Sequence, residues 1–230
     1  GSVDNRFLAG AEWNYSKNFG KGQVYDLYKP LSVSGWGARP RAYSSIPGIQ
    51  NFSAFLEYNA TATVGNHRLE LQAGLRTASL LGLDRRYEMQ GKIYLDPRVS
   101  LKWSLPSISV GGEPLRLAVV GGIGKTTKMP TLNYLYPDLH YNDITELSYY
   151  DINRPAEYSR FVVRSYIQDP TNNRLRPATN LKKEIRLDVA FAGNELSVGY
   201  FRENMNSGFR YMAVFAPYAY NDYDETAIDA

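Results

Sequence analysis

The run of residues with the most obvious chemical potential is Val119–Thr127, VVGGIGKTT. Closely spaced glycines followed by Lys and Thr can hold a phosphate, because the glycine N–H groups and the amino end of a following helix bind the anion. Here Val119 stands where a regular phosphate loop has its first glycine, and Pro130 with a Tyr-rich run follows in place of a helical pattern. A nucleotide-binding enzyme built on GGIGKTT is therefore a remote alternative.

Carboxylates and histidines give little support for catalysis or metal binding. Asp138, Asp143 and Glu146 lie near His140, but their spacing matches no known cation loop. The acidic end of the chain is typical of a solvated tail. The sequence has no cysteine and no G-x-S-x-G elbow, which argues against thiolate chemistry and a hydrolase triad. We expect no enzyme activity, no cofactor and no metal site.

Aromatic side chains in two long loops are the better candidates for ligand contact. The chain holds 19 Tyr, and a tyrosine ring offers both an apolar face and a polar group. The candidate ligand-binding residues are Trp36, Tyr43, Tyr134, Tyr136, Tyr141, Tyr149 and Tyr150. The alternative is that these rings pack the loops on each other or form an aromatic girdle around a barrel.

Composition excludes several classes of protein. The formal net charge of +3 over 230 residues is too small to argue for nucleic acid as a partner. No run approaches the roughly 18 apolar residues of a transmembrane helix. Alternation of apolar and polar residues recurs instead, which places side chains on opposite faces of strands.

Alternation predicts an all-β chain. The expected strands cover 7–15, 51–64, 68–78, 91–105, 115–122 and 208–215, with a hairpin at 180–204 and a local hairpin pairing 144–153 with 159–168. Gly193-Asn194 is the expected tight turn of the main hairpin. Pro97 lies inside a strand pattern and should mark a bulge or an edge.

The connections between these strands alternate in length. Those near residues 65, 106–114 and 193 are short, whereas those at 16–50, 79–90 and 125–179 are long. An antiparallel up-and-down meander with short turns at one end and long loops at the other is typical of a transmembrane β-barrel with long extracellular loops.

Several phrases, taken in order, resemble the barrel of TonB-dependent outer-membrane receptors, and most closely the large nutrient receptors of Bacteroidetes-type bacteria. Among them are FLAGAEWNYSKNFGKG, YLDPRVSLKW and LSVGYFRENMNSGFRY. The family pattern G-x-G…K-x-P…L-Y-P-D is matched by Gly122, Gly124, Lys128, Pro130 and Leu135–Asp138. The pattern N-x-x-L-x-P-x-x-N-x-x-x-E is matched by Asn172, Leu175, Pro177, Asn180 and Glu184.

The resemblance implies that residues 1–230 form one segment of such a barrel, without its plug, with residues 1–2 as a tag remnant. It implies TonB-driven nutrient uptake at the cell outer membrane, with the loops at 16–50 and 125–179 facing outside. The implied partners are the TonB complex, a surface lipoprotein, outer-membrane lipid and an extracellular nutrient (a glycan, a peptide or a metal chelate). A soluble β-sandwich module that binds carbohydrate or peptide is the open alternative, because the same alternation would serve it.

Overall fold

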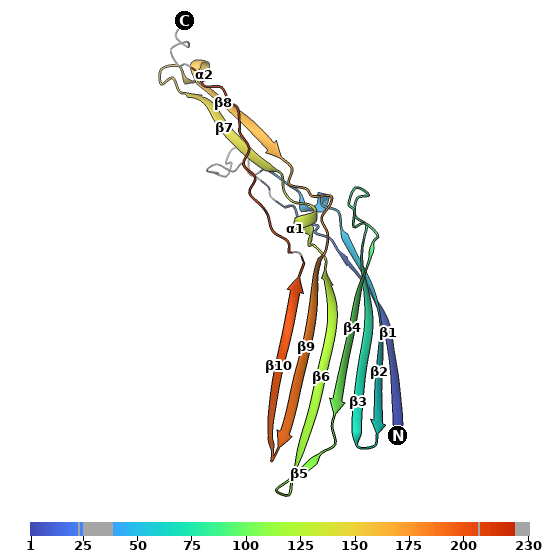
Figure 1. Ribbon diagram of the computed structural model, residues 1–230. Coiled ribbons are helices and arrows are strands. Elements are labelled where there is room, and N and C mark those ends of the chain that lie inside the picture. The colour runs from blue at the N-terminus through green and yellow to red at the C-terminus, as the bar shows by residue number, and fades with distance from the viewer. Residues whose placement is uncertain (23, 25–38, 207, 224–230) are drawn as a thin grey trace. The chain divides into compact units, whose positions relative to one another are not determined.

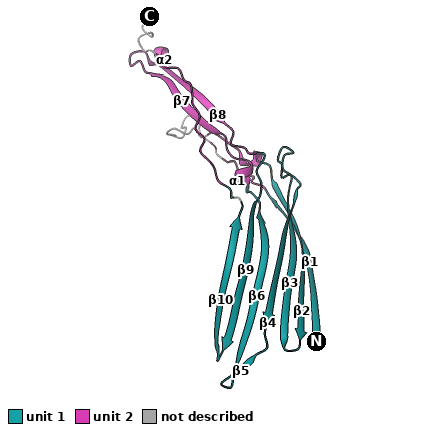
Figure 2. Cartoon of the chain, in the orientation of Figure 1, with its two compact units in different colours: residues 1–16, 47–131, 173–209 teal, residues 17–46, 132–172, 210–230 magenta. Residues whose placement is uncertain are grey.

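Antiparallel β-strands dominate the computed structural model, which describes residues 1–22, 24, 39–206 and 208–223 (Figure 1). The all-β class and the meander order predicted from alternation are confirmed. The chain divides into two compact units (Figure 2). Unit 1 contains residues 1–16, 47–131 and 173–209, and unit 2 contains residues 17–46, 132–172 and 210–230.

Unit 1 is one antiparallel sheet with the order β1-β2-β3-β4-β6-β9-β10, and the short strand β5 pairs with β6. Its strands are β1 (Ser2–Ser16), β2 (Ile49–Val64), β3 (His67–Leu81), β4 (Ile93–Ser104), β5 (Ile108–Val110), β6 (Glu113–Lys128), β9 (Ala178–Phe191) and β10 (Asn194–Met205). Because neighbours are antiparallel, the short connections gather at one end of the sheet, the turn end. The long connections leave from the other, the loop end.

Among the described residues, three hairpins of the sheet close with two-residue turns, and the one at Gly111-Gly112 joins β5 to β6. Gly65-Asn66 joins β2 to β3, and Ala192-Gly193 joins β9 to β10. The main hairpin was expected to turn at Gly193-Asn194, but Asn194 is already the first residue of β10. Ala192 and Gly193 have φ values of 48° and 77°, as a type I′ turn requires at both central positions. Gly193 adopts its positive φ without the steric cost that a side chain would add.

Pro97 forms no bulge with the strand before it. Its register with β3 is unbroken, since Leu75 lies opposite Pro97. The pairing of β4 with β6 instead begins only at Arg98, opposite Gly124. Proline has no backbone N–H to donate, so Pro97 lies where the ladder between β4 and β6 ends.

The register sorts the side chains of the sheet onto two faces. The apolar face carries, among others, Phe7, Trp13, Phe52, Leu56, Leu71, Val99, Leu101, Trp103, Val119, Ile123, Ile185, Leu187, Leu196 and Val198. The polar face carries, among others, Arg6, Glu12, Asn51, Glu57, Arg76, Asp96, Arg98, Lys182, Glu184, Arg186 and Asp188. The sheet is thus one amphipathic layer.

Long side chains on the polar face lie across their neighbouring strands. Arg98 on β4 reaches over Gly74 on β3 to form an ion pair with Glu57 on β2. A Cβ at Gly74 would come within 2.9 Å of the Arg98 guanidinium, so the glycine leaves the path open. Glu57 also accepts hydrogen bonds from Asn59 and Gln72, each at 3.0 Å.

The most buried apolar side chains of unit 1 lie near the loop end of the sheet. They include Ile49, Leu80, Leu83, Tyr87 and Met89. The connection at 82–92 is held there by the N–H of Gly91, which donates to the Leu80 carbonyl at 3.0 Å. Leu80 lies opposite Asn51 and Ile49 has the parity of Asn51, so both strand residues of this small core lie on the polar face and the apolar face stays exposed.

Unit 2 contains the second, smaller sheet. Strands β7 (His140–Tyr149) and β8 (Arg160–Gln168) form an antiparallel hairpin, which confirms the local hairpin predicted between 144–153 and 159–168. Three short helices accompany it: η1 (Tyr43–Ser45), α1 (Leu132–Leu135) and α2 (Pro155–Tyr158). No helix within the described part of the chain is long and apolar enough to cross a membrane.

The strand expected over 208–215 is wrong. These residues carry no strand pairing, and Met212, Val214 and Phe215 are exposed. Their contacts run through side chains, since the Tyr211 hydroxyl donates to the Asn133 carbonyl at 2.9 Å. Alternation alone cannot make a strand that lacks a ladder partner.

The turn at Gly193 provides a test of the fold. We expect Gly193→Ala to lower the free energy of unfolding by about 1 kcal/mol, because alanine is strained at a positive φ. Gly121→Ala is the matched control, since a Cβ at Gly121 meets nothing within 4 Å and its φ is not positive. Urea unfolding of the detergent-bound chain, followed by circular dichroism, measures both. Equal stability of the two variants would contradict the assigned turn.

Candidate ligand-binding site

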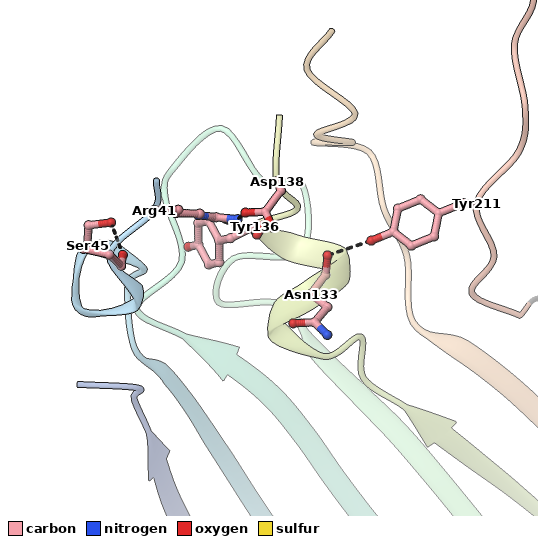
Figure 3. A network of polar contacts seen from close by, with 7 residues as sticks. Arg41, Ser45, Asn133, Tyr136, Asp138 and Tyr211 are labelled. Carbon is pink, nitrogen blue, oxygen red and sulfur yellow. Dashed lines mark hydrogen bonds and ion pairs between the residues drawn. The ribbon is translucent and has the colours of Figure 1, made fainter. Parts of the chain in front are cut away.

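The loops of unit 2 are joined by arginine side chains that were not predicted as site residues. Arg41 forms an ion pair with Asp138, and its guanidinium also donates to the Tyr136 carbonyl at 2.9 Å (Figure 3). Asn133, in the short helix α1, accepts the hydrogen bond from Tyr211. Segments that lie more than 70 residues apart in sequence therefore meet here.

A second cluster forms on the β7–β8 hairpin. Arg39 donates to both carboxylate oxygens of Asp143, at 2.8 and 2.9 Å, and its guanidinium lies 4.7 Å from the centre of the Tyr141 ring. The Ser165 hydroxyl donates to the same carboxylate from β8. These hydrogen bonds and the Arg39 charge hold the pKa of Asp143 below its usual value, with the Ser165 bond as the largest cause.

The end of the described chain lies along the other side of this hairpin. Glu146 forms an ion pair with Arg164 and accepts the Asn221 N–H at 2.8 Å. The Tyr166 hydroxyl donates to the Ala219 carbonyl. The Arg164 hydrogen bond is the largest cause of a lowered pKa at Glu146, and the same pair raises the pKa of Arg164.

The predicted aromatic residues fall into two groups. Tyr134 stacks on Tyr211 with ring centres 5.4 Å apart, Tyr136 and Tyr141 lie in the arginine clusters, and Tyr43 lies in η1. Tyr149 and Tyr150 lie instead at the tip of the β7–β8 hairpin. The candidate rings within the described residues therefore form no single aromatic surface, and Trp36 lies outside those residues.

Tyr150 is the most open of these rings. It is 71% exposed, and its neighbours at the hairpin tip, Ile152 and Phe161, are also exposed. By contrast Tyr134, Tyr136 and Tyr141 are half-buried. The contacts favour a packing role for the half-buried rings and leave the hairpin tip as the aromatic surface available to a ligand.

The carboxylates near His140 do not gather into a metal site. Asp138, Asp143 and Glu146 each form an ion pair with a different arginine. Within the described residues, no group of three or more His, Cys, Asp or Glu side chains could hold a metal ion.

The polar face of unit 1 contains a hollow that the sequence did not reveal. Its volume is about 680 Å³, which is within the range of small-molecule pockets. It extends over the loop-end half of strands β1, β2, β3, β4 and β6, and its polar lining includes Glu12, Asn14, Asn51, Arg76, Asp96 and Lys125. Asp96 is buried and is held by Thr127, whose N–H and hydroxyl donate to it at 3.0 and 2.6 Å.

The chemistry of this hollow suits a polar solute that carries both kinds of charge. Cationic Arg76 and Lys125 share it with anionic Glu12, and the nearest contact of Arg76 to Glu12 is a long 3.7 Å. Phe55 adds one aromatic ring, which lies against Gly10. Alternation could have placed Glu12, Phe55 and Arg76 on one face, but their meeting across strands depends on the register.

The run Val119–Thr127 lies inside strand β6. The backbone of its glycines is paired with β4 on one side and β9 on the other. The segment therefore has the geometry of a sheet, and the N–H groups do not converge as in a phosphate loop.

Comparisons of the chain with protein-family models, with curated proteins and with solved structures found no match. A function must therefore be argued from the two faces of the sheet and from the loops.

The Arg41 cluster can be tested by proteolysis. We expect Asp138→Asn to speed tryptic cleavage of the Arg41–Ala42 bond several-fold, because the half-buried Arg41 loses its ion pair and becomes available to the protease. Glu157→Gln on the exposed helix α2 is the control. Mass spectrometry of the early fragments measures both rates. An unchanged rate in Asp138→Asn would show that the cluster does not restrain this segment.

The Asp143 cluster predicts a pH dependence. A lowered carboxyl pKa contributes stability that is present above the ordinary value of 3.8 and is lost as the pH falls through the folded-state pKa. We expect the tyrosine near-ultraviolet circular dichroism to persist down to about pH 4 and to fade below it. Asp143→Asn should weaken this signal already at neutral pH. Loss of the wild-type signal near pH 5 or 6 would contradict the cluster.

Proposed function

We propose that this chain forms part of the barrel wall of a TonB-dependent outer-membrane receptor that takes up a nutrient. In this proposal the apolar face of unit 1 contacts lipid, the polar face lines the interior, and the loops of unit 2 lie outside the cell. The observation that carries it is the exposed apolar face of a single-layer sheet.

The apolar face lacks a covering layer within the described residues. Phe7 is 69% exposed, Ile185 56% and Val198 61%. A soluble protein rarely leaves a contiguous apolar surface of this extent open to water. Lipid removes that surface from water without a second protein layer. The backbone N–H and C=O groups of each strand are satisfied by hydrogen bonds to the neighbouring strands.

The tryptophans Trp13 and Trp103 lie at two levels on this face. Trp13 lies opposite Phe52 toward the loop end. Trp103 lies at the level of Ala62 toward the turn end, where its Nε1 donates to His67 Nδ1 at 3.2 Å. The span from Phe52 to Ala62 along β2 is about 33 Å at ~3.3 Å per residue. With a strand tilt of about 40°, this corresponds to about 25 Å of membrane, the usual height of the apolar band between two aromatic girdles.

The polar face and the loops support the same orientation. Ion pairs such as Arg98–Glu57 and Arg186–Asp188 and the hollow of about 680 Å³ suit a surface that lines a wet interior. The long connections all leave from the loop end, where the proposal puts the outside of the cell. The proposed partners and ligand rest on the sequence resemblance. They are the TonB complex, a surface lipoprotein and a nutrient that is a glycan, a peptide or a metal chelate.

The competing proposal is a soluble β-sandwich module. A sandwich buries its apolar face against a second sheet across about 10 Å. The second sheet present, β7–β8, belongs to the other compact unit and has only two strands. The sandwich therefore gains no specific support from the sheet topology.

Arginine placed at mid-height on each face distinguishes lipid from water. We expect Val99→Arg to lower the free energy of unfolding in lipid vesicles by about 2–4 kcal/mol, because a cation at the membrane midplane destabilises such barrels. Ser100→Arg, one residue along on the polar face, should change it by less than about 0.5 kcal/mol. Urea titration in vesicles, followed by tryptophan fluorescence, gives both values. Equal effects of the two variants would contradict the proposal.

A further inference from the structure

The apolar face of unit 1 carries two cations side by side, Lys183 on β9 and Arg202 on β10. The register places them directly opposite each other, on the same face as the next opposed pair, Ile185 and Tyr200. Counted from the two-residue turn, every second opposed pair is hydrogen-bonded, and Lys183–Arg202 is one of these, with Cα atoms about 5.5 Å apart. Like charges that face each other across neighbouring strands destabilise a sheet.

The protein does not balance the charges of this pair. Both side chains are exposed, and within the described residues neither forms an ion pair. In the paired stretches that the structure describes, no Asp or Glu lies on this face of β6, β9 or β10. Lys182 is adjacent in sequence but lies on the polar face, where it pairs with Glu184 at 3.2 Å. The sheet thus neutralises the lysine on its polar face and leaves the one on its apolar face open to an anion.

The register also shows how the apolar surface runs across the sheet. The row of Ile185 meets β2 at Ala60, through Gly121, Leu101 and Leu71. On β2 the apolar residues continue toward the loop end as far as Phe52, whereas on β9 the charge of Lys183 ends the apolar run directly after Ile185. The margin of the apolar surface therefore crosses the rows obliquely, as a level line does on tilted strands.

The height of the cationic pair follows from this tilt, on the proposed function that the apolar face contacts lipid. With a tilt of about 40° and strands about 4.8 Å apart, a level line moves along the strand by roughly 4 Å, or about 1.2 residues, at each step to the next strand. Four steps from Phe52 this line reaches β9 near residues 181–183, and the fifth step reaches Arg202. Lys183 and Arg202 therefore lie at the level of Phe52, the loop-end margin of the apolar surface.

The chemistry of this position selects an amphiphilic anion. A guanidinium donates two parallel hydrogen bonds to a phosphate, and a lysine ammonium adds a compact positive charge. Toward the turn end the pair adjoins Ile185 and Tyr200, which are 56% and 69% exposed and offer an apolar surface to an acyl chain. A free phosphate ion would leave that surface uncovered, whereas a lipid with a phosphate headgroup covers it and neutralises both cations.

We propose that Lys183 and Arg202 bind the phosphate of an acidic membrane lipid in the leaflet at the loop end. The site lies on the apolar face, so it is distinct from the hollow on the polar face and from the loops of unit 2. The bound phosphate removes the repulsion between two cations that the register holds opposite each other. The inference rests on the proposed function, because a lipid headgroup reaches this level only where lipid covers the apolar face.

Spin-labelled lipids test the pair in phosphatidylcholine vesicles that contain the chain. Electron paramagnetic resonance measures how strongly the protein immobilises a phosphatidic acid probe relative to a phosphatidylcholine probe. We expect wild type to prefer phosphatidic acid, and Lys183→Gln and Arg202→Gln each to lower its relative association constant about fivefold, the effect of about one basic residue near a membrane surface. Lys182→Gln is the matched control and should leave the constant unchanged. Circular dichroism checks that all variants keep the same strand content.

The possible failures are distinguishable. Equal immobilisation of both probes, or a preference that Lys183→Gln and Arg202→Gln leave unchanged, would overturn this inference and leave the lipid contact intact. Displacement of the phosphatidic acid probe by millimolar inorganic phosphate would identify the free ion as the ligand and would also overturn it. A chain that immobilises neither probe would overturn the proposed function and this inference with it.

A local reporter tests the place of binding, since the chain has no cysteine of its own. A bimane fluorophore attached at Tyr200→Cys should be quenched more strongly by phosphatidic acid with a nitroxide near its headgroup than by the matching phosphatidylcholine. Ala54→Cys, on the apolar face of β2 at about the same height, is the control and should be quenched equally by both lipids. Equal quenching at Tyr200→Cys, or a preference for phosphatidic acid at Ala54→Cys, would refute the assigned site.

Discussion

The apolar face of a single amphipathic sheet must be covered by another apolar layer, and the rest of this structure depends on that requirement. Apolar surface in water costs free energy roughly in proportion to its area, at about 25 cal/mol per Å². Ordinary β proteins meet the requirement by stacking a second sheet. Here the seven long strands of unit 1 form one layer, and the small buried cluster around Leu80 and Met89 lies at the loop end with Leu80 on the polar face, so it does not cover the apolar face. In the proposed function, lipid satisfies this requirement.

The polar face is organised by the same register that produces the apolar one. Because side chains alternate strictly, every residue that faces lipid in the proposal has neighbours that face the other way. Long charged side chains there lie flat over glycines, as Arg98 does over Gly74, and form pairs two strands apart. A hollow with mixed charges is left toward the loop end. The proposed contacts with the membrane and with a solute would thus both follow from one strand pattern.

Local patterns were sufficient to predict much of the fold. Alternation predicted β2, β3, β9 and the β7–β8 hairpin, because period-two patterns and short turns are local signals. The expected strand at 208–215 was wrong, because a strand also needs a neighbouring ladder. The turn was misplaced by one residue, because Ala192 gives no sequence signal for a positive φ.

The candidate site depended on information that is not local. Arg39 and Arg41 reach carboxylates that lie about one hundred residues further along the chain, so spacing could not pair them. The hollow likewise requires the register of five strands. Tyrosine content pointed to the loops, yet it could not separate half-buried Tyr141 from exposed Tyr150.

The most direct test of the central claim is the environment of the two faces in a lipid bilayer. A nitroxide attached at Val99→Cys and one attached at Ser100→Cys report on adjacent residues of β4, and the chain offers no competing cysteine. Electron paramagnetic resonance measures their collisions with oxygen, which concentrates in lipid, and with a water-soluble nickel complex. The account predicts high oxygen and low nickel access at residue 99 and the reverse at residue 100. Equal access at both positions, or high nickel access at residue 99, would contradict it.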